Sequence, residues 1–91
     1  MSLASATMSE GKPRTSQDLD PNVVLGALIR ELREQAKLSQ EEVGTRAEID
    51  EREIASIEAG QLEPTWGDLR RIAGALRVPL PELLARLESR D

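Results

Sequence analysis

Signals that begin or end a helix recur at short intervals from Asp20 onward, and this spacing restricts the chain to short helices. Asp20-Pro21 offers an N-cap followed by proline at the first helical position. Apolar residues then recur at three- and four-residue spacing and form one stripe: Leu25, Leu28, Ile29, Leu32 and Ala36. The pattern predicts a first helix from about Pro21 to Ala36.

Two further helices are predicted between Ser39 and Gly60. Ser39-Gln40-Glu41-Glu42 is an S-x-x-E capping box that opens a helix of about two turns. Asp50, with Glu53 three residues later, predicts another start of the capping-box kind. Gly60 follows where the C-terminus of a helix favours a positive φ.

The last two helices begin after Thr65 and after Pro79. Thr65-Trp66-Gly67-Asp68 opens the fourth helix, and Pro79 with Pro81 opens the fifth. We therefore predict an all-α, compact five-helix domain over residues 21–91. Residues 1–20 contain no periodic apolar pattern and are predicted to form a flexible N-terminal tail.

The apolar positions of these five helices predict the core. A chain of this size buries only about 60% of its surface, so each core side chain contributes strongly to stability. The predicted core residues are Leu25, Leu28, Leu32, Val43, Ala47, Ile49, Ile54, Ile57, Leu69, Ile72, Leu76, Val78, Leu80 and Leu83.

The composition excludes several classes of site. Histidine and cysteine are absent, which excludes a disulfide framework, a Cys/His zinc site, a thiol nucleophile and a Ser-His triad. We therefore expect no cofactor, no metal and no enzyme activity. Apolar runs are too short to span a membrane, and the N-terminus lacks a signal-peptide pattern, so we expect a cytoplasmic protein.

The strongest functional signal is the segment from Gln40 to Gly60, where two short helices are joined by a three-residue turn. Gly44 is small enough for the second of these helices to cross closely. Ile49 is an apolar plug in the turn, while Ile54 and Ile57 anchor the second helix to the core. This is helix-turn-helix geometry, which leaves the outer face of the second helix free for a DNA major groove.

Several motifs keep an order and spacing that resemble a known family. They are LSQEEV (38–43), IASIEAG (54–60), EPT (63–65), LRRIAGAL (69–76), VPL (78–80) and ELL (82–84). Over roughly residues 22–87 the chain resembles the phage Cro/repressor type, the xenobiotic-response-element family of helix-turn-helix regulators, including small restriction-modification controllers. The resemblance implies a five-helix DNA-binding domain, usually dimeric, that acts in transcription.

Positions matched to this family indicate the DNA-facing residues. The resemblance places Glu51, Arg52, Ala55 and Ser56 opposite the bases, with Asp50 at the start of the recognition helix. Gln40 either orients on a phosphate or is solvated surface. Arg46 is predicted to contact phosphate, with Lys37, Lys12 and Arg14 as further candidates.

Arg52 and Ser56 each allow a second interpretation. Arg52 binds guanine or phosphate, or else forms a local pair with Glu48 or Glu53. Ser56 faces a base if DNA binds, and is otherwise exposed without a role.

The segment departs from the family in its charge and in its turn. From Asp50 to Gly60 there is one basic residue, Arg52, against four acidic residues, and the whole chain carries a net charge of −5. An acidic balance normally argues against nucleic acid as the partner. The family usually has glycine where this chain has Glu48; if that position needs a positive φ, glutamate costs about 1 kcal/mol.

Other candidate residues are structural or belong to a dimer. Arg33 and Glu58 resemble a family pair that ties the first helix to the third, and we expect a structural salt bridge. Trp66 is either half-buried against the fourth helix or part of a partner surface. Leu84 and Leu87 belong to the core or to the seam of a homodimer.

Two functions remain open from the sequence. The first is a sequence-specific DNA-binding transcriptional regulator, which places residues 50–59 in the major groove of double-stranded DNA as a dimer. The alternative is a helix-turn-helix fold used as a protein-binding module, antitoxin-like or anti-repressor. Salt-sensitive binding to a palindromic duplex distinguishes the first from the second.

Overall fold

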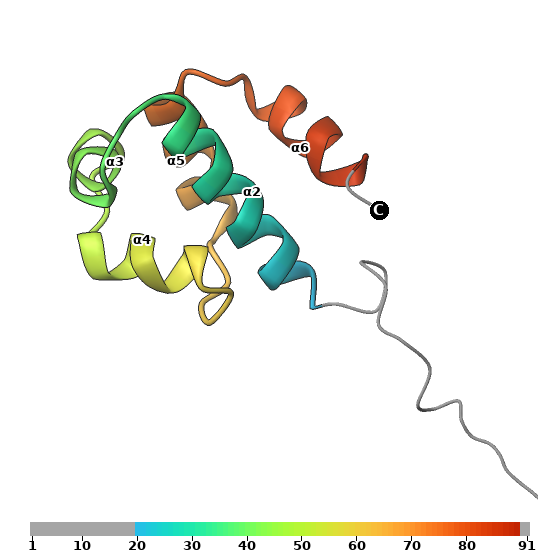
Figure 1. Cartoon of the computed structure of the whole chain (residues 1–91), viewed down its shortest axis with the longest axis horizontal. Coiled ribbons are helices and arrows are strands. Elements are labelled where there is room, and N and C mark those ends of the chain that lie inside the picture. The colour runs from blue at the N-terminus through green and yellow to red at the C-terminus, as the bar shows by residue number, and fades with distance from the viewer. Residues whose placement is uncertain (1–19, 90–91) are drawn as a thin grey trace, which may run out of the picture.

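The computed structural model describes residues 20–89, and within this range the chain forms five α-helices. They are α2 (Pro21–Gln35), α3 (Gln40–Ala47), α4 (Glu51–Glu58), α5 (Trp66–Leu76) and α6 (Leu80–Glu88) (Figure 1). The predicted all-α, five-helix fold is confirmed. Except for Asp20, the predicted tail lies outside the described residues, and so do Lys12 and Arg14.

Side-chain caps explain where most of these helices begin. Both reciprocal bonds of a capping box form between Ser39 and Glu42 at α3 and between Thr65 and Asp68 at α5. Asp50 is the N-cap of α4, as predicted, but the predicted capping box with Glu53 does not form. The Asp50 carboxylate accepts from the backbone N–H of Arg52 at 2.7 Å, while the N–H of Glu53 bonds to the Asp50 carbonyl at 2.9 Å.

A residue with left-handed backbone conformation lies at or just after the C-terminus of four helices, α2, α3, α4 and α5. Gly60 has φ +77°, as its position predicts, and Glu48 has φ +59° at the end of α3. Lys37 and Arg77 also adopt φ +61°, which no glycine in the sequence indicated. At three helix ends the chain therefore keeps a side chain where glycine is less strained.

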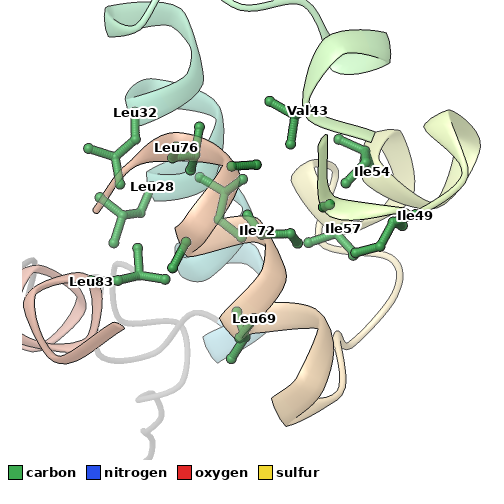
Figure 2. Close-up of a cluster of buried hydrophobic side chains, with 14 of the residues drawn as sticks. Leu28, Leu32, Val43, Ile49, Ile54, Ile57, Leu69, Ile72, Leu76 and Leu83 are labelled. Carbon is green, nitrogen blue, oxygen red and sulfur yellow. The ribbon is translucent and has the colours of Figure 1, made fainter. Parts of the chain in front are cut away.

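The core lies where the five helices meet (Figure 2). Every predicted core residue is buried except Val78 and Leu80, which are partly buried and packed against the cluster. Those two corrections concern residues in and next to the α5–α6 loop, where less of the chain covers them. The core also includes Ile29, Ala73 and Ala75, which the predicted set omitted.

Two close approaches of backbone determine how the helices pack. The packing pairs are α3 with α5 and α4, α2 with α4 and α6, and α5 with α6. A Cβ added at Gly44 would lie 2.6 Å from the carbonyl oxygen of Ile49, so the close crossing predicted at Gly44 is present. A Cβ at Gly26 would lie 2.7 Å from the carbonyl oxygen of Glu58, which brings α2 against the end of α4.

The described helices include none that is both long and apolar enough to cross a membrane.

Candidate nucleic-acid interface

The turn between α3 and α4 holds the two helices of the motif in a fixed relation. Glu48 ends α3 in the left-handed conformation, and the backbone N–H of Ile49 donates to the Gly44 carbonyl at 2.8 Å. The Ile49 side chain is buried, as predicted, between the two helices. The turn thus sets the angle between α3 and α4, and α4 lies on the side of the molecule opposite α6 (Figure 1).

The outer face of α4 brings together the predicted base-facing residues. Glu51 and Arg52 are exposed in its first turn, and Ala55 and Ser56 are partly exposed one turn later. Asp50 is exposed at the N-cap, where its carboxylate is engaged by the backbone N–H of Arg52.

Arg52 has a free guanidinium on this face. No ion pair joins it to any described carboxylate, so the predicted alternative of a local pair with Glu48 or Glu53 is not formed. Its charge faces solvent among the exposed carboxylates of Asp50, Glu51 and Glu53. The face therefore carries one available cation, which can donate two parallel hydrogen bonds to an acceptor such as guanine.

Arg33 and Glu58 form the predicted salt bridge between α2 and α4. Arg33 Nε lies 2.6 Å from Glu58 Oε2, and Nη2 lies 3.1 Å from Oε1. The side chains are 13% and 3% exposed. The hydrogen bond to Glu58 raises the pKa of Arg33 above its ordinary value, against the opposing effect of burial. The Arg33 guanidinium is therefore held in its charged form, and the Glu58 carboxylate is buried against it and is not exposed on the outer face of α4.

Gln40 joins this pair and is not simply solvated surface, which corrects one of its two predicted interpretations. Its side-chain amide donates to Glu58 Oε1 at 3.0 Å, and the residue is partly buried. One N–H of the side-chain amide is thereby engaged, and the second N–H stays available as a donor to a phosphate. The backbone N–H groups at the start of α3 are further donors of this helix end.

A hollow of about 400 Å³ lies beside α4 and contains a candidate that the sequence did not indicate. Its lining residues are Arg30, Arg33, Gln40, Ala55, Glu58 and Ala59. Arg30 is 64% exposed here and pairs with Glu34 at 3.2 Å. Because such exposed pairs are weak, the Arg30 guanidinium is available to an anion in the hollow. Arg30 lies on the exposed side of α2, where charged residues are common, so the sequence gave no reason to select it as a binding residue.

Arg46 does not join the other candidates. It is exposed on α3 and lines a separate cleft with Arg71 and Arg77, to which α4 contributes no residue.

The candidate dimer residues lie on α5 and α6. Trp66 is 61% exposed at the start of α5, directly after the N-cap residue Thr65, so the half-buried interpretation is wrong. Leu84 and Leu87 are partly buried on α6, and Leu87 packs against the core.

Comparison with known proteins relates this geometry to a family. The family model described as "Helix-turn-helix domain" matches residues 24–87. The restriction-modification controller protein C.AhdI from Aeromonas hydrophila is 31% identical, with a TM-score of 0.66 over 68% of this chain and 94% of that chain.

Two solved structures with lower identity have the same fold. The clp gene regulator ClgR from Corynebacterium glutamicum is 18% identical, with a TM-score of 0.74 over 78% of this chain and 76% of that chain. The restriction-modification controller protein C.Esp1396I is 19% identical, with a TM-score of 0.74 over 79% and 95%. No curated protein sequence matches this chain.

Proposed function

The chain belongs to the helix-turn-helix domain family, and from this premise we propose that it is a transcriptional regulator that binds double-stranded DNA as a homodimer. The family resemblance predicted from the motifs is thereby confirmed. The similarity to a restriction-modification controller at 31% identity supports a regulatory role of the same kind. The DNA-facing residues proposed are Gln40, Asp50, Glu51, Arg52, Ala55 and Ser56.

The observation that carries this proposal is the unpaired Arg52 on the outer face of a helix whose other end is firmly anchored. Glu58, at the end of α4, is held by Arg33 and Gln40. A recognition helix fixed in this way keeps its base-reading side chains in register with the groove. Arg52 then reads guanine, Glu51 accepts from cytosine N4, and Ser56 lies next to them, which favours a half-site containing G·C.

Phosphate contacts are few in this proposal, so the salt dependence is shallow. Arg30 lines the hollow beside α4, and on DNA binding its guanidinium leaves Glu34 and pairs with a backbone phosphate. The backbone N–H groups at the start of α3 supply a second contact. With few phosphates neutralised, affinity depends mostly on the base edges.

A single short recognition helix reads too few bases to specify a site, and this supports two-fold pairing. Such a dimer places its recognition helices about 34 Å apart on a palindromic site. Trp66, Leu84 and Leu87 are proposed as the seam, because Trp66 is a large apolar side chain left exposed.

Selection of bound fragments from random duplex DNA at low salt tests the proposal. We expect a palindrome with G·C in each half-site. On the selected site, Arg52→Ala is expected to cost about 1–3 kcal/mol of binding free energy. Arg70→Ala removes an exposed arginine on α5 and serves as the matched control, with little change. Failure to enrich any sequence would contradict sequence-specific DNA binding.

The acidity of the same face favours protein binding as the second candidate function. Asp50, Glu51 and Glu53 surround Arg52 with exposed carboxylates, and such a face repels DNA and attracts a basic protein surface. Two results together would favour this antitoxin-like or anti-repressor function over DNA binding. No duplex is enriched, and a cellular protein is retained on the immobilised chain but not on its Glu51→Gln variant.

A further inference from the structure

Three arginines converge on a cleft between α3 and α5, which we call the arginine cleft. Arg46 comes from the last turn of α3, Arg71 from the middle of α5 and Arg77 from its end, with Gly74 and Ala75 between them. The cleft has a volume of about 300 Å³, and no acidic residue lines it. Three cations in one cleft are notable in a chain with a net charge of −5.

A hollow of about 250 Å³ adjoins the arginine cleft, and two arginines are among its lining residues. We call it the apolar hollow because its other lining residues are alanine and leucine. The two share Arg46, Ala75 and Arg77, and the hollow adds Ala36, Leu38 and Leu76. Together they form a surface with a cationic part and an apolar part. Small-molecule sites commonly combine apolar lining with a few charged groups that orient the ligand.

Arg71 is already held in place at the edge of the arginine cleft. Its Nε donates to the Ala47 carbonyl at 3.0 Å, and its Nη2 lies 2.6 Å from Asp68 Oδ1. These bonds fix the guanidinium plane and leave its Nη1 without a hydrogen bond among the described residues. A preorganised cation loses little conformational freedom when an anion binds to it.

Arg46 and Arg77 have no ion pair with any described carboxylate. Part of this arrangement has a structural explanation, because positive side chains compensate the partial negative charge at a helix C-terminus. Arg71 binds a carbonyl at the end of α3, and Arg46 lies in the last turn of α3. The same effect applies to the charge of Arg77, which is the C-cap of α5, but not to its left-handed conformation (φ +61°), which glycine adopts with less strain. Asp68 compensates the charge of Arg71, whereas Arg46 and Arg77 repel each other and are stabilised by an anion between them.

We infer that the arginine cleft binds a small molecule that carries a phosphoryl group, with the rest of the ligand over the apolar hollow. Guanidinium groups match phosphate oxygens with paired hydrogen bonds: Arg46 and Arg77 can each donate such a pair, and Arg71 can add a bond from its Nη1. No residue of α4 lines the cleft, so the ligand leaves the proposed DNA-reading face open. The inference does not depend on the proposed function.

Calorimetric titration of the full chain with inorganic pyrophosphate tests this inference. Saturable binding at one site per chain is expected. Arg77→Gly and Arg46→Gln should each weaken it at least about ten-fold, because each removes a charged donor. Arg70→Gln is the matched control: it removes an exposed α5 arginine outside the arginine cleft and should change the affinity less than about two-fold.

Thermal melting separates lost binding from lost folding. Arg77→Gly relieves the left-handed strain, so this variant should melt at or above the wild-type temperature while binding pyrophosphate poorly. No saturable binding to the wild type, or equal binding by wild type and both cleft variants, overturns the inference.

A titration with duplex DNA distinguishes the sources of the phosphoryl group. A small-molecule site predicts that Arg46→Gln and Arg77→Gly leave duplex affinity within about two-fold of wild type, as Arg70→Gln does. If the cleft variants instead weaken duplex binding as much as pyrophosphate binding, the cleft is a DNA-backbone contact and the small-molecule inference fails.

Discussion

Gln40 and Glu58 are joined by a 3.0 Å hydrogen bond from the side-chain amide of Gln40 to Oε1 of the buried carboxylate. Glu58 Oε2 accepts at 2.6 Å from Arg33, whose Nη1 also donates to the Leu38 carbonyl at 2.8 Å. One carboxylate thus connects α2, the start of α3 and the end of α4. The helix that we propose to read DNA is held at its C-terminal end by buried polar bonds in addition to apolar packing.

Removal of Arg33 alone should therefore be costly. Arg33→Met leaves a carboxylate that is 3% exposed with Gln40 as its remaining side-chain donor. We expect a loss of about 3–5 kcal/mol in the free energy of unfolding, measured by urea denaturation, because an unpaired buried charge is left behind. The double variant Arg33→Met, Glu58→Met should lose less free energy of unfolding than Arg33→Met alone. Strictly additive losses would contradict a buried, coupled pair.

Gly26 is expected to be more sensitive to substitution than its helical position indicates. Gly26→Ala places a methyl group 2.7 Å from the carbonyl oxygen of Glu58, so α2 and α4 must separate. We expect a loss of about 1–3 kcal/mol by chemical denaturation. Gly74→Ala is the matched control, since nothing lies within 4 Å of its added Cβ, and it should stabilise α5 by up to about 1 kcal/mol. A neutral Gly26→Ala would show that the close approach is absent.

Glu48 is predicted to store backbone strain in the turn of the motif. Glu48→Gly should raise the free energy of unfolding by about 1 kcal/mol, because φ +59° is unstrained for glycine. Glu48→Ala removes the same carboxylate but keeps a Cβ, and should give no such gain. Equal stabilisation by both variants would assign the effect to charge, not to the backbone.

Local signals made most of the fold predictable from the sequence. The capping boxes at Ser39 and Thr65 depend only on residues within one helical turn, so spacing identifies them. The left-handed ends at Lys37 and Arg77 were missed because neither is glycine. Backbone hydrogen bonds close both ends, from the N–H of Leu38 to the Arg33 carbonyl and from the N–H of Val78 to the Ala73 carbonyl.

The candidate site was predictable only in part, because side chains from distant segments complete it. The family resemblance identified Arg33 with Glu58, but not the contribution of Gln40, which depends on the meeting of α3 with α4. Arg46 and Arg71 come together through the packing of α3 on α5, and spacing along the sequence carries no sign of it.

The proposed homodimer makes a prediction about the chain's one tryptophan. If Trp66 lies in the seam, its fluorescence should shift to shorter wavelength as protein concentration rises, because the indole leaves water. Trp66→Ser should weaken association in sedimentation experiments without lowering the melting temperature of the monomer, since the side chain is 61% exposed. A monomer alone at tens of micromolar would contradict the dimer.

The two exposed glutamates of α4's first turn should affect DNA binding in different ways. Glu51 is proposed to accept from cytosine N4, whereas Glu53 has no assigned base. Glu53→Gln removes repulsion from the phosphate backbone only, so it should raise affinity for all duplexes alike. Glu51→Gln should also raise non-specific affinity, yet it should reduce the preference for the selected half-site, because a mismatched contact typically costs about 1–3 kcal/mol. Competition binding on selected and scrambled duplexes at matched salt measures both effects. If the two variants lose the preference for the selected half-site equally, Glu51 does not contact a base and Arg52 is the specific contact.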